Sequence, residues 1–174
     1  MNYNHYMHKL VQSFRDNQTT HFMFIKHYNT LLISEEELHS IVVDETSNRC
    51  LLFHEFPMHS MQGPYAPFLD WIRELYYSYF KEEQTPEEFV KNGGVYPLQQ
   101  EVYASYIRTG TATRTEDLLL IELEYERQRM LQSLVNLYLY VSERRPIFIF
   151  LEKLHLANDS CINFLNDSNF AHRF

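Results

Sequence analysis

The sequence predicts an α/β domain built around a parallel sheet. Three short apolar runs, near residues 22–25, 50–54 and 147–151, have the length of buried strands. Stretches in which apolar residues recur at helical spacing lie between these runs, and strands that alternate with helices are typical of parallel sheets. The chain has 174 residues, 45% of them hydrophobic, and contains no internal repeat or linker. We therefore expect a single domain over residues 1–174.

Two helices are predicted near the N-terminus, one on each side of the first strand. Apolar residues between Tyr3 and Phe14 recur at helical spacing, which predicts an amphipathic helix before the strand. After the strand, Ser34 and Glu37 have the spacing of a capping box, in which two side chains satisfy backbone N–H groups at a helix start. A second helix is therefore predicted to begin at Ser34.

The middle of the chain is predicted to be helical. Pro67 precedes the periodic stretch "FLDWIRELYYSYF", and proline is well tolerated in the first turn of a helix. Thr85 and Glu88 repeat the capping-box spacing, and Gly93 is expected to end that short helix. The segment "PLQQEVYASYIRTG" predicts a further helix that ends at Gly110.

The last third of the chain predicts a long helix, a strand and a final helix. Residues 116–143 contain neither glycine nor proline and read as one long helix. Pro146 then precedes the third strand, and "NDSCINFLNDSNF" begins the last helix. All the helices from Pro67 to residue 143 thus form an insertion between the second and third strands.

Composition excludes several classes of function. A net charge of −8 argues against direct contact with nucleic acid, because phosphate neutralisation needs clustered Lys and Arg. No apolar run is long enough to span a bilayer, and "MNYNHYMHKL" lacks the apolar core of a signal peptide. Cys50 and Cys161 are most simply reduced thiols. We therefore expect a cytoplasmic protein that contacts neither nucleic acid nor membrane.

Two segments carry a resemblance to a known family. One is "ERQRMLQSLVNLYLYVSERRPIFIFLEKLHLANDSCINFL", residues 126–165, and the other is "GPYAPFLDWIRELY", residues 63–76. The first resembles the Walker B region of AAA-like, STAND-type P-loop ATPases found in MalT-like regulators and fused to adenylate cyclases. There an "RRP" sequence leads into an apolar strand, a tip of two acids and an "LHWAD" turn. The second resembles the "PYxPF" segment that follows the second strand of those proteins.

The resemblance implies a phosphate-binding loop after the first strand, and the sequence departs from it there. When the pattern G-x-x-x-x-G-K-[ST] is laid on this loop, Ser34 takes the last position. His27 and Leu32 then stand at the two glycines, and Ile33 stands at the lysine. Glycine lets backbone N–H groups approach phosphates and lysine neutralises their charge, so this loop has lost both features.

The tip of the third strand is also altered. In the family the first acid of the tip binds Mg²⁺ and the second activates water. Glu152 keeps the first position, where it would hold Mg²⁺ through water, but Lys153 takes the second, and a charged lysine is no base. Asn158 replaces the final acid of the "LHWAD" turn. If a residual site exists, Ser34, Lys153 and Glu152 hold ATP and Mg²⁺; otherwise we expect no cofactor and no catalytic residue.

The resemblance also sets an expectation for the sheet. The family has five strands in the order 5-1-4-3-2, and this sequence ends before a fourth strand. We therefore expect an incomplete, three-stranded P-loop NTPase-like sheet flanked by helices, in which the first and third strands lack their shared neighbour. Three outcomes stay open: a rearranged small sheet, a partner that supplies the missing strands, or a truncated remnant of a larger protein.

The leading interpretation is a degenerate AAA/STAND-like ATPase domain without catalytic activity. Such a domain acts as an interaction or regulatory module in signal transduction, with a protein partner or a missing downstream domain. One alternative is a residual ATP-binding or ATPase domain of a signalling or transcription-regulatory protein. Another is a small α/β protein with an accidental likeness. His54, Glu55 and His59 lie close together, but their spacing is not that of a zinc-binding helix, which favours ordinary loop residues.

Overall fold

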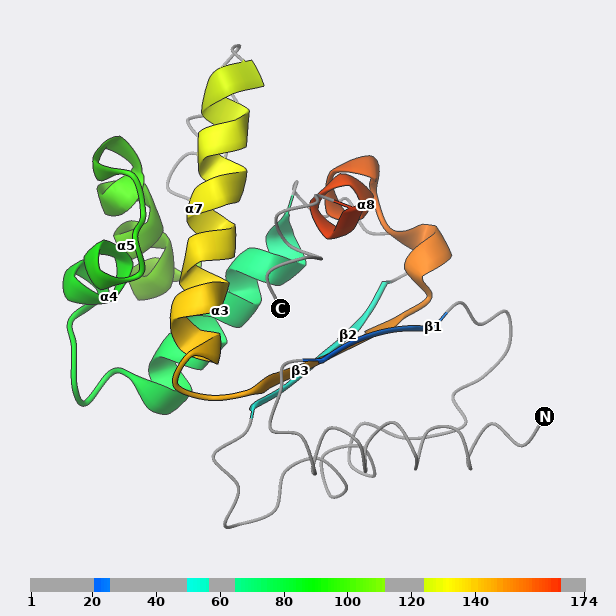
Figure 1. The fold of residues 1–174 in the computed structure, drawn as a ribbon, viewed down its shortest axis with the longest axis horizontal. Coiled ribbons are helices and arrows are strands. Elements are labelled where there is room, and N and C mark those ends of the chain that lie inside the picture. The colour runs from blue at the N-terminus through cyan, green and yellow to red at the C-terminus, as the bar shows by residue number, and fades with distance from the viewer. Residues whose placement is uncertain (1–20, 26–49, 57–64, 112–123, 167–174) are drawn as a thin grey trace. The chain divides into compact units, whose positions relative to one another are not determined.

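The computed structural model describes residues 21–25, 50–56, 65–111 and 124–166. The chain divides into two compact units (Figure 1). The first unit contains Met1–Ser60 and Ser142–Ala157, and holds the strands. The second contains Met61–Val141 and Asn158–Arg173, and is helical in its described residues.

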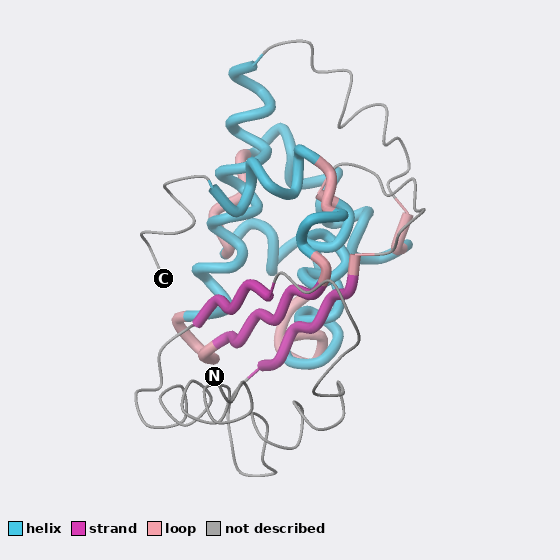
Figure 2. Tube along the Cα trace, turned by 90° about the vertical axis from the view of Figure 1, so that its right-hand side faces the viewer, coloured by secondary structure: helices cyan, strands magenta, loops and turns pink. Residues whose placement is uncertain are grey.

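The first unit is a small parallel sheet. Its strands are β1 (His21–Ile25), β2 (Cys50–Glu55) and β3 (Ile147–Glu152), and Figure 2 shows them side by side. The order is β1-β3-β2, with both pairs parallel. All six residues of the central strand β3 are buried. This explains why its sequence is continuously apolar up to Glu152, as is usual for central strands of parallel sheets.

The strand order bears on the expected gap in the sheet. β1 pairs directly with β3, from His21 opposite Phe148 to Ile25 opposite Glu152. No strand therefore stands between them, whereas the family order places the fourth strand there. In the described sheet the first and third strands thus lack the shared neighbour, but they pair with each other directly, so no open edge is left between them. Of the three outcomes left open by the sequence, a rearranged small sheet agrees with this order.

The second unit begins with three helices whose ends follow the predicted signals. They are α3 (Ala66–Tyr79), α4 (Pro86–Asn92) and α5 (Gln100–Thr109), and a 3-10 turn, η1 (Pro97–Gln99), precedes α5. The capping box at Thr85 and Glu88 is formed in both directions, and Gly93 is the C-cap of α4. Gly110 ends α5 in the left-handed conformation, which glycine adopts without steric cost.

Two more helices follow along the chain. α7 (Glu124–Ser142) covers the described part of the predicted long helix, whose residues 116–123 lie outside the description. α8 (Asp159–Asn166) is the predicted final helix. The described residues are thus mostly helical, with parallel strands in one sheet and a helical insertion between β2 and β3. This arrangement confirms the α/β class.

Aromatic side chains fill the core of the helical unit. Phe68 of α3 lies 4.4 Å from Phe164 of α8, measured between ring centroids, and Tyr138 of α7 lies 6.5 Å from Phe164. Phe89 contacts Phe80 at 5.0 Å and Tyr140 at 5.8 Å in a second cluster. Since aromatic side chains bury large areas, these contacts contribute much of the apolar burial that holds the helices together.

Buried tyrosines also join the helices by hydrogen bonds. The hydroxyl of Tyr138 donates to the carbonyl oxygen of Phe68 at 2.9 Å, and the hydroxyl of Tyr103 donates to that of Met130 at 2.9 Å. Tyr138 and Tyr103 are 0% and 2% exposed. Each phenol therefore brings apolar area into the core and satisfies its own donor there.

Several sequence predictions fall outside the described residues. They are the helix between Tyr3 and Phe14, the helix that begins at Ser34, and the loop from His27 to Ser34. Of the helices in the described ranges, none has both the length and the apolar content that crossing a bilayer demands.

Candidate functional site

The carboxyl ends of β2 and β3 meet at one edge of the sheet. Glu55 and Glu152 are opposite each other in the register, at the last position of each strand. The backbone N–H of Phe56 donates to the carbonyl oxygen of Glu152 at 3.1 Å, which extends the pairing by one step. Ligands of open α/β sheets bind outside the carboxyl ends of the strands, so this edge is the candidate binding site.

Lys153 follows β3 in a sharp change of direction. Its backbone is left-handed, with φ 53° and ψ 38°, which is uncommon for a residue other than glycine. The N–H of Leu156 donates to the carbonyl oxygen of Lys153 at 2.8 Å and opens the short 3-10 turn η2 (Leu154–Leu156). The strand therefore ends at Glu152, and Lys153 begins the turn that leaves the sheet.

Lys153 forms an ion pair across the sheet edge. Its ammonium nitrogen Nζ donates to Oε1 of Glu55. The side chain of Lys153 is 39% exposed and that of Glu55 is 40% exposed. The hydrogen bond from Glu55 is the main cause that raises the pKa of Lys153; burial opposes it, and the charges of Glu55 and Glu152 add to it. Lys153 is therefore a cation at neutral pH.

Glu152 occupies a different environment from its two neighbours. The residue is 4% exposed, whereas Glu55 lies at the exposed end of β2. A hydrated magnesium ion reaches such a carboxylate only if the surrounding chain opens. Among the side chains that the structure describes, no group of three or more His, Cys, Asp and Glu is placed to hold a metal ion.

The histidine candidates give no metal site of their own in the described part of the chain. The ring of His54 packs edge-on against Phe56, with centroids 4.6 Å apart. His59, the other histidine of this segment, lies outside the described residues. His54 therefore lies within β2, not in a loop, and its ring packs against Phe56.

Asn158 has a local role that the sequence did not suggest. Its side-chain oxygen Oδ1 accepts the backbone N–H of Cys161 at 2.9 Å, and its carbonyl oxygen accepts the N–H of Ile162 at 3.1 Å. These bonds make Asn158 the N-cap of α8. Asn and Asp are about equally good at this position, so replacing the acid of the "LHWAD" turn leaves helix capping intact.

The predicted site residues are brought together only in part. Glu152 and Lys153 lie at the edge of the sheet as expected from the end of an apolar strand, while Ser34 lies outside the described residues. Sequence reasoning considered Glu55 only as a metal ligand and missed it as the partner of Lys153. A signal existed, because Glu55 ends the second apolar run as Glu152 ends the third, and parallel neighbours end at the same edge.

The lysine at the strand tip is thus paired with an acid from the neighbouring strand. Comparisons with known proteins leave that description unchanged: no family model, no curated protein and no solved structure matches the chain.

Proposed function

We propose that this chain is a degenerate P-loop NTPase-like domain of the AAA/STAND type that acts as a non-catalytic interaction or regulatory module. The observation that carries the proposal is the ion pair between Lys153 and Glu55 at the carboxyl ends of β3 and β2. The sequence resemblance supplies the family, and the chemistry of this pair argues that the edge no longer hydrolyses nucleotide.

Nucleotide hydrolysis starts from an activated water molecule. Activation of water for phosphoryl transfer requires a residue that orients it or accepts its proton. The position that the resemblance assigns to this residue holds Lys153, whose pKa is raised by its hydrogen bond to Glu55. A lysine that is protonated and hydrogen-bonded has no lone pair to accept a proton. Hydrolysis is therefore not expected at this edge.

The charges at the sheet edge do not favour the phosphates of a nucleotide. A phosphate chain needs positive charge and converging N–H groups. At the sheet edge two carboxylates, Glu55 and Glu152, stand beside one ammonium, Lys153, so the sum of charges is not positive. The loop from His27 to Ser34 contains neither glycine nor the P-loop lysine, and the whole chain carries −8. Electrostatics at short and at long range thus oppose nucleotide binding.

The outer strands of the sheet offer a surface for interaction with a partner. In the order β1-β3-β2, the strands β1 and β2 are the edges of the described sheet. An edge strand offers backbone N–H and C=O groups to a strand of another chain, and such pairing is a common mode of recognition. A protein partner, or a further domain that supplies strands, fits this feature better than a small-molecule substrate does.

Calorimetric titration with Mg-ATP tests the proposal. We expect flat heats for the unmodified chain and for Lys153→Ala, and no release of phosphate. Glu55→Gln is the informative variant, because it removes the acid that neutralises Lys153 and thereby makes nucleotide binding less unfavourable. Lys91→Ala, which changes a lysine of α4 in the other unit, is the matched control.

The outcomes separate the two leading interpretations. Binding near about 1 μM by the unmodified chain, lost in Lys153→Ala and kept in Lys91→Ala, would overturn the proposal in favour of the residual ATP-binding domain. Light scattering tests the interaction half. Concentration-dependent self-association supports accessible sheet edges, whereas a clean monomer at high concentration would contradict this use of the sheet.

A further inference from the structure

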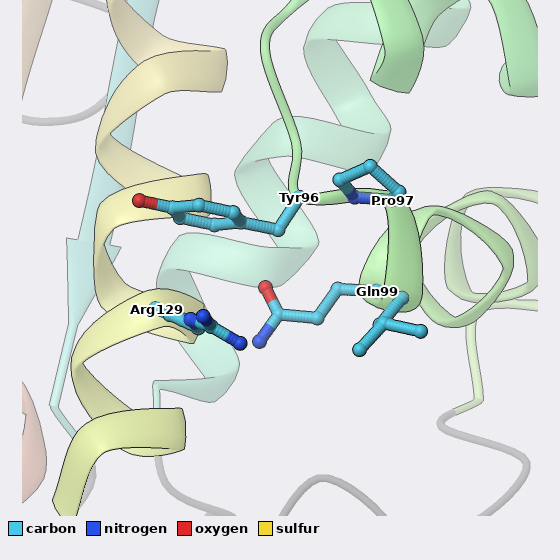
Figure 3. A pocket seen from close by; sticks show the side chains of 5 residues that line it. Tyr96, Pro97, Gln99 and Arg129 are labelled. Carbon is cyan, nitrogen blue, oxygen red and sulfur yellow. The ribbon is translucent and has the colours of Figure 1, made fainter.

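A small pocket lies in the helical unit, formed by residues that the proposed function does not use. It has a volume of about 190 Å³, and Figure 3 shows its lining side chains. The segment that enters α5 supplies four of them and α7 supplies the fifth; they are Tyr96, Pro97, Leu98, Gln99 and Arg129. Sites for drug-sized ligands measure about 300–1,000 Å³, so this pocket accepts one functional group and a short apolar attachment.

Gln99 is the unusual residue of the pocket. It is only 5% exposed, and its oxygen Oε1 accepts the hydroxyl of Ser133 at 2.7 Å. Its amide nitrogen Nε2 is buried, and within the described residues no acceptor lies at hydrogen-bond distance from it. Buried donors in folded proteins almost always have an acceptor in the protein, in ordered water or in a ligand, so Nε2 is left to bind a water or a ligand at the pocket.

Arg129 adds a second donor group beside the amide. Its guanidinium carbon lies 5.5 Å from the centre of the Tyr96 ring, which holds the charged plane over the aromatic face. In Figure 3 the guanidinium of Arg129 and the side-chain amide of Gln99 point toward each other, and both residues line the pocket. Two neighbouring donor groups, one of them cationic, are complementary to a group that only accepts and carries negative charge.

The rest of the lining is apolar and accessible. Leu98 is 82% exposed and Tyr96 is 39% exposed, with Pro97 between them. An apolar group that covers Leu98 and Tyr96 removes this surface from water. The donor groups of the pocket therefore suit an anionic end of a ligand, and its apolar side chains suit an apolar end of the same ligand.

We propose that this pocket binds a carboxylate that is attached to a small apolar group. The carboxylate accepts hydrogen bonds from Nε2 of Gln99 and from Arg129, and the apolar group covers Leu98 and Tyr96. This chemistry is shared by the C-terminus of a peptide that ends in an aliphatic residue and by a free short-chain carboxylic acid. Either ligand is bound without any change in covalent bonds.

A turned amide of Gln99 is the competing arrangement. After a rotation by half a turn, Nε2 would donate to Ser133 and Oε1 would face Arg129, so that no donor is left over. Against it, the hydroxyl oxygen of Ser133 already accepts the backbone N–H of Tyr96 at 3.3 Å. It would then accept twice and need another acceptor for its own hydrogen. The response of the Gln99 side-chain amide signals to an added acid distinguishes the two arrangements.

The test is an NMR titration of the full chain, in which the side-chain amide signals of Gln99 are followed. The ligands are N-acetyl-leucine, its carboxamide N-acetyl-leucinamide, and 4-methylpentanoate, which has the acid and the aliphatic group without the peptide unit. We expect saturable shifts with both acids and at least about tenfold weaker binding of the carboxamide. Tighter binding of N-acetyl-leucine than of 4-methylpentanoate assigns the site to peptide C-termini, and the reverse assigns it to free acids.

Variants establish which residues bind the ligand. Gln99→Met and Arg129→Met each remove one donor group and are expected to weaken acid binding by about tenfold or more. Arg108→Met is the control, since this exposed arginine of α5 pairs with Glu87 and Glu101 and does not line the pocket. Circular dichroism shows whether each variant is folded. If Gln99→Met is not, the Gln99 signals of the unmodified chain still decide the question.

Three results would overturn the proposal. The first is an absence of saturable binding of the acids up to about 10 mM. The second is equal binding of N-acetyl-leucine and its carboxamide, which would remove the carboxylate from the argument. The third is acid binding that leaves the Gln99 amide signals in place, as the turned amide predicts.

Discussion

Replacing Tyr138 by phenylalanine removes one buried hydroxyl from the core of the helical unit. In the structure this hydroxyl donates to the carbonyl oxygen of Phe68, and the side chain of Tyr138 is 0% exposed. Burial is the main cause that raises the pKa of Tyr138 well above 10.0, and the charges of Glu74 and Asp70 add to it. The substitution therefore removes a hydrogen bond and an ionisable group at the same time.

These two effects act at different pH values. At pH 8 the phenol is neutral in both states, so Tyr138→Phe loses only the hydrogen bond to the Phe68 carbonyl, which costs about 0.5–1.5 kcal/mol of unfolding free energy. Above pH 10 the unfolded chain releases the phenol proton while the folded chain retains it. Because the folded pKa is raised, the stability of the unmodified chain is complete below pH 10 and falls as the pH rises. At pH 11 the fall for one tyrosine is about 1.4 kcal/mol.

Urea unfolding at pH 8 and pH 11 measures both effects. The variant is expected to be less stable at pH 8, and its stability relative to the unmodified chain is expected to rise by about 1.4 kcal/mol at pH 11, because phenylalanine does not ionise. Phe89→Leu is the control: it removes buried apolar volume and no ionisable group, so its deficit should be equal at both pH values. A gap for Tyr138→Phe that stays constant between pH 8 and pH 11 would refute the reasoning.

Three further predictions concern local features. Thr85→Ala removes the capping box that Thr85 forms with Glu88 and should lower the unfolding free energy by about 1 kcal/mol in urea titrations, whereas an unchanged midpoint would contradict the cap. Gly110→Ala should cost about 1–2 kcal/mol by the same assay, because φ is +69° and the new Cβ would lie 3.2 Å from Nε of Arg73. Burial raises the pKa of the Cys161 thiol to about 11, so an aromatic disulfide reagent at pH 8 should modify it only after urea is added; rapid modification of the folded chain would show that the helix is open there.

Features set by short stretches of sequence could be predicted. The capping box at Thr85, the end of α5 at Gly110 and the strand that follows Pro146 each depend on neighbours within a few residues. The α/β class followed from apolar periodicity, which reports burial without any knowledge of partners. These predictions therefore needed no knowledge of contacts between distant residues.

Features that join distant segments could not be predicted in detail. The pairing of Glu55 with Lys153 depends on the register of β2 against β3. The pocket at Gln99 depends on α7 placing Arg129 opposite the segment that enters α5. In both cases each side chain taken alone reads as an ordinary polar residue. The chemistry arises only from the pairing, which short-range patterns do not contain.

The order of the strands has a consequence for how the chain folds during synthesis. β3 is the only described strand that pairs with both others, and its partners in β1 and β2 precede it by about a hundred residues or more along the chain. A ribosome therefore releases β1 and β2 well before the strand that joins them. α3, α4 and α5 all emerge in that interval, and their contacts are local in sequence. The sheet cannot form before β3 emerges, and until then chaperones are needed to keep its apolar strands from aggregating with other nascent chains.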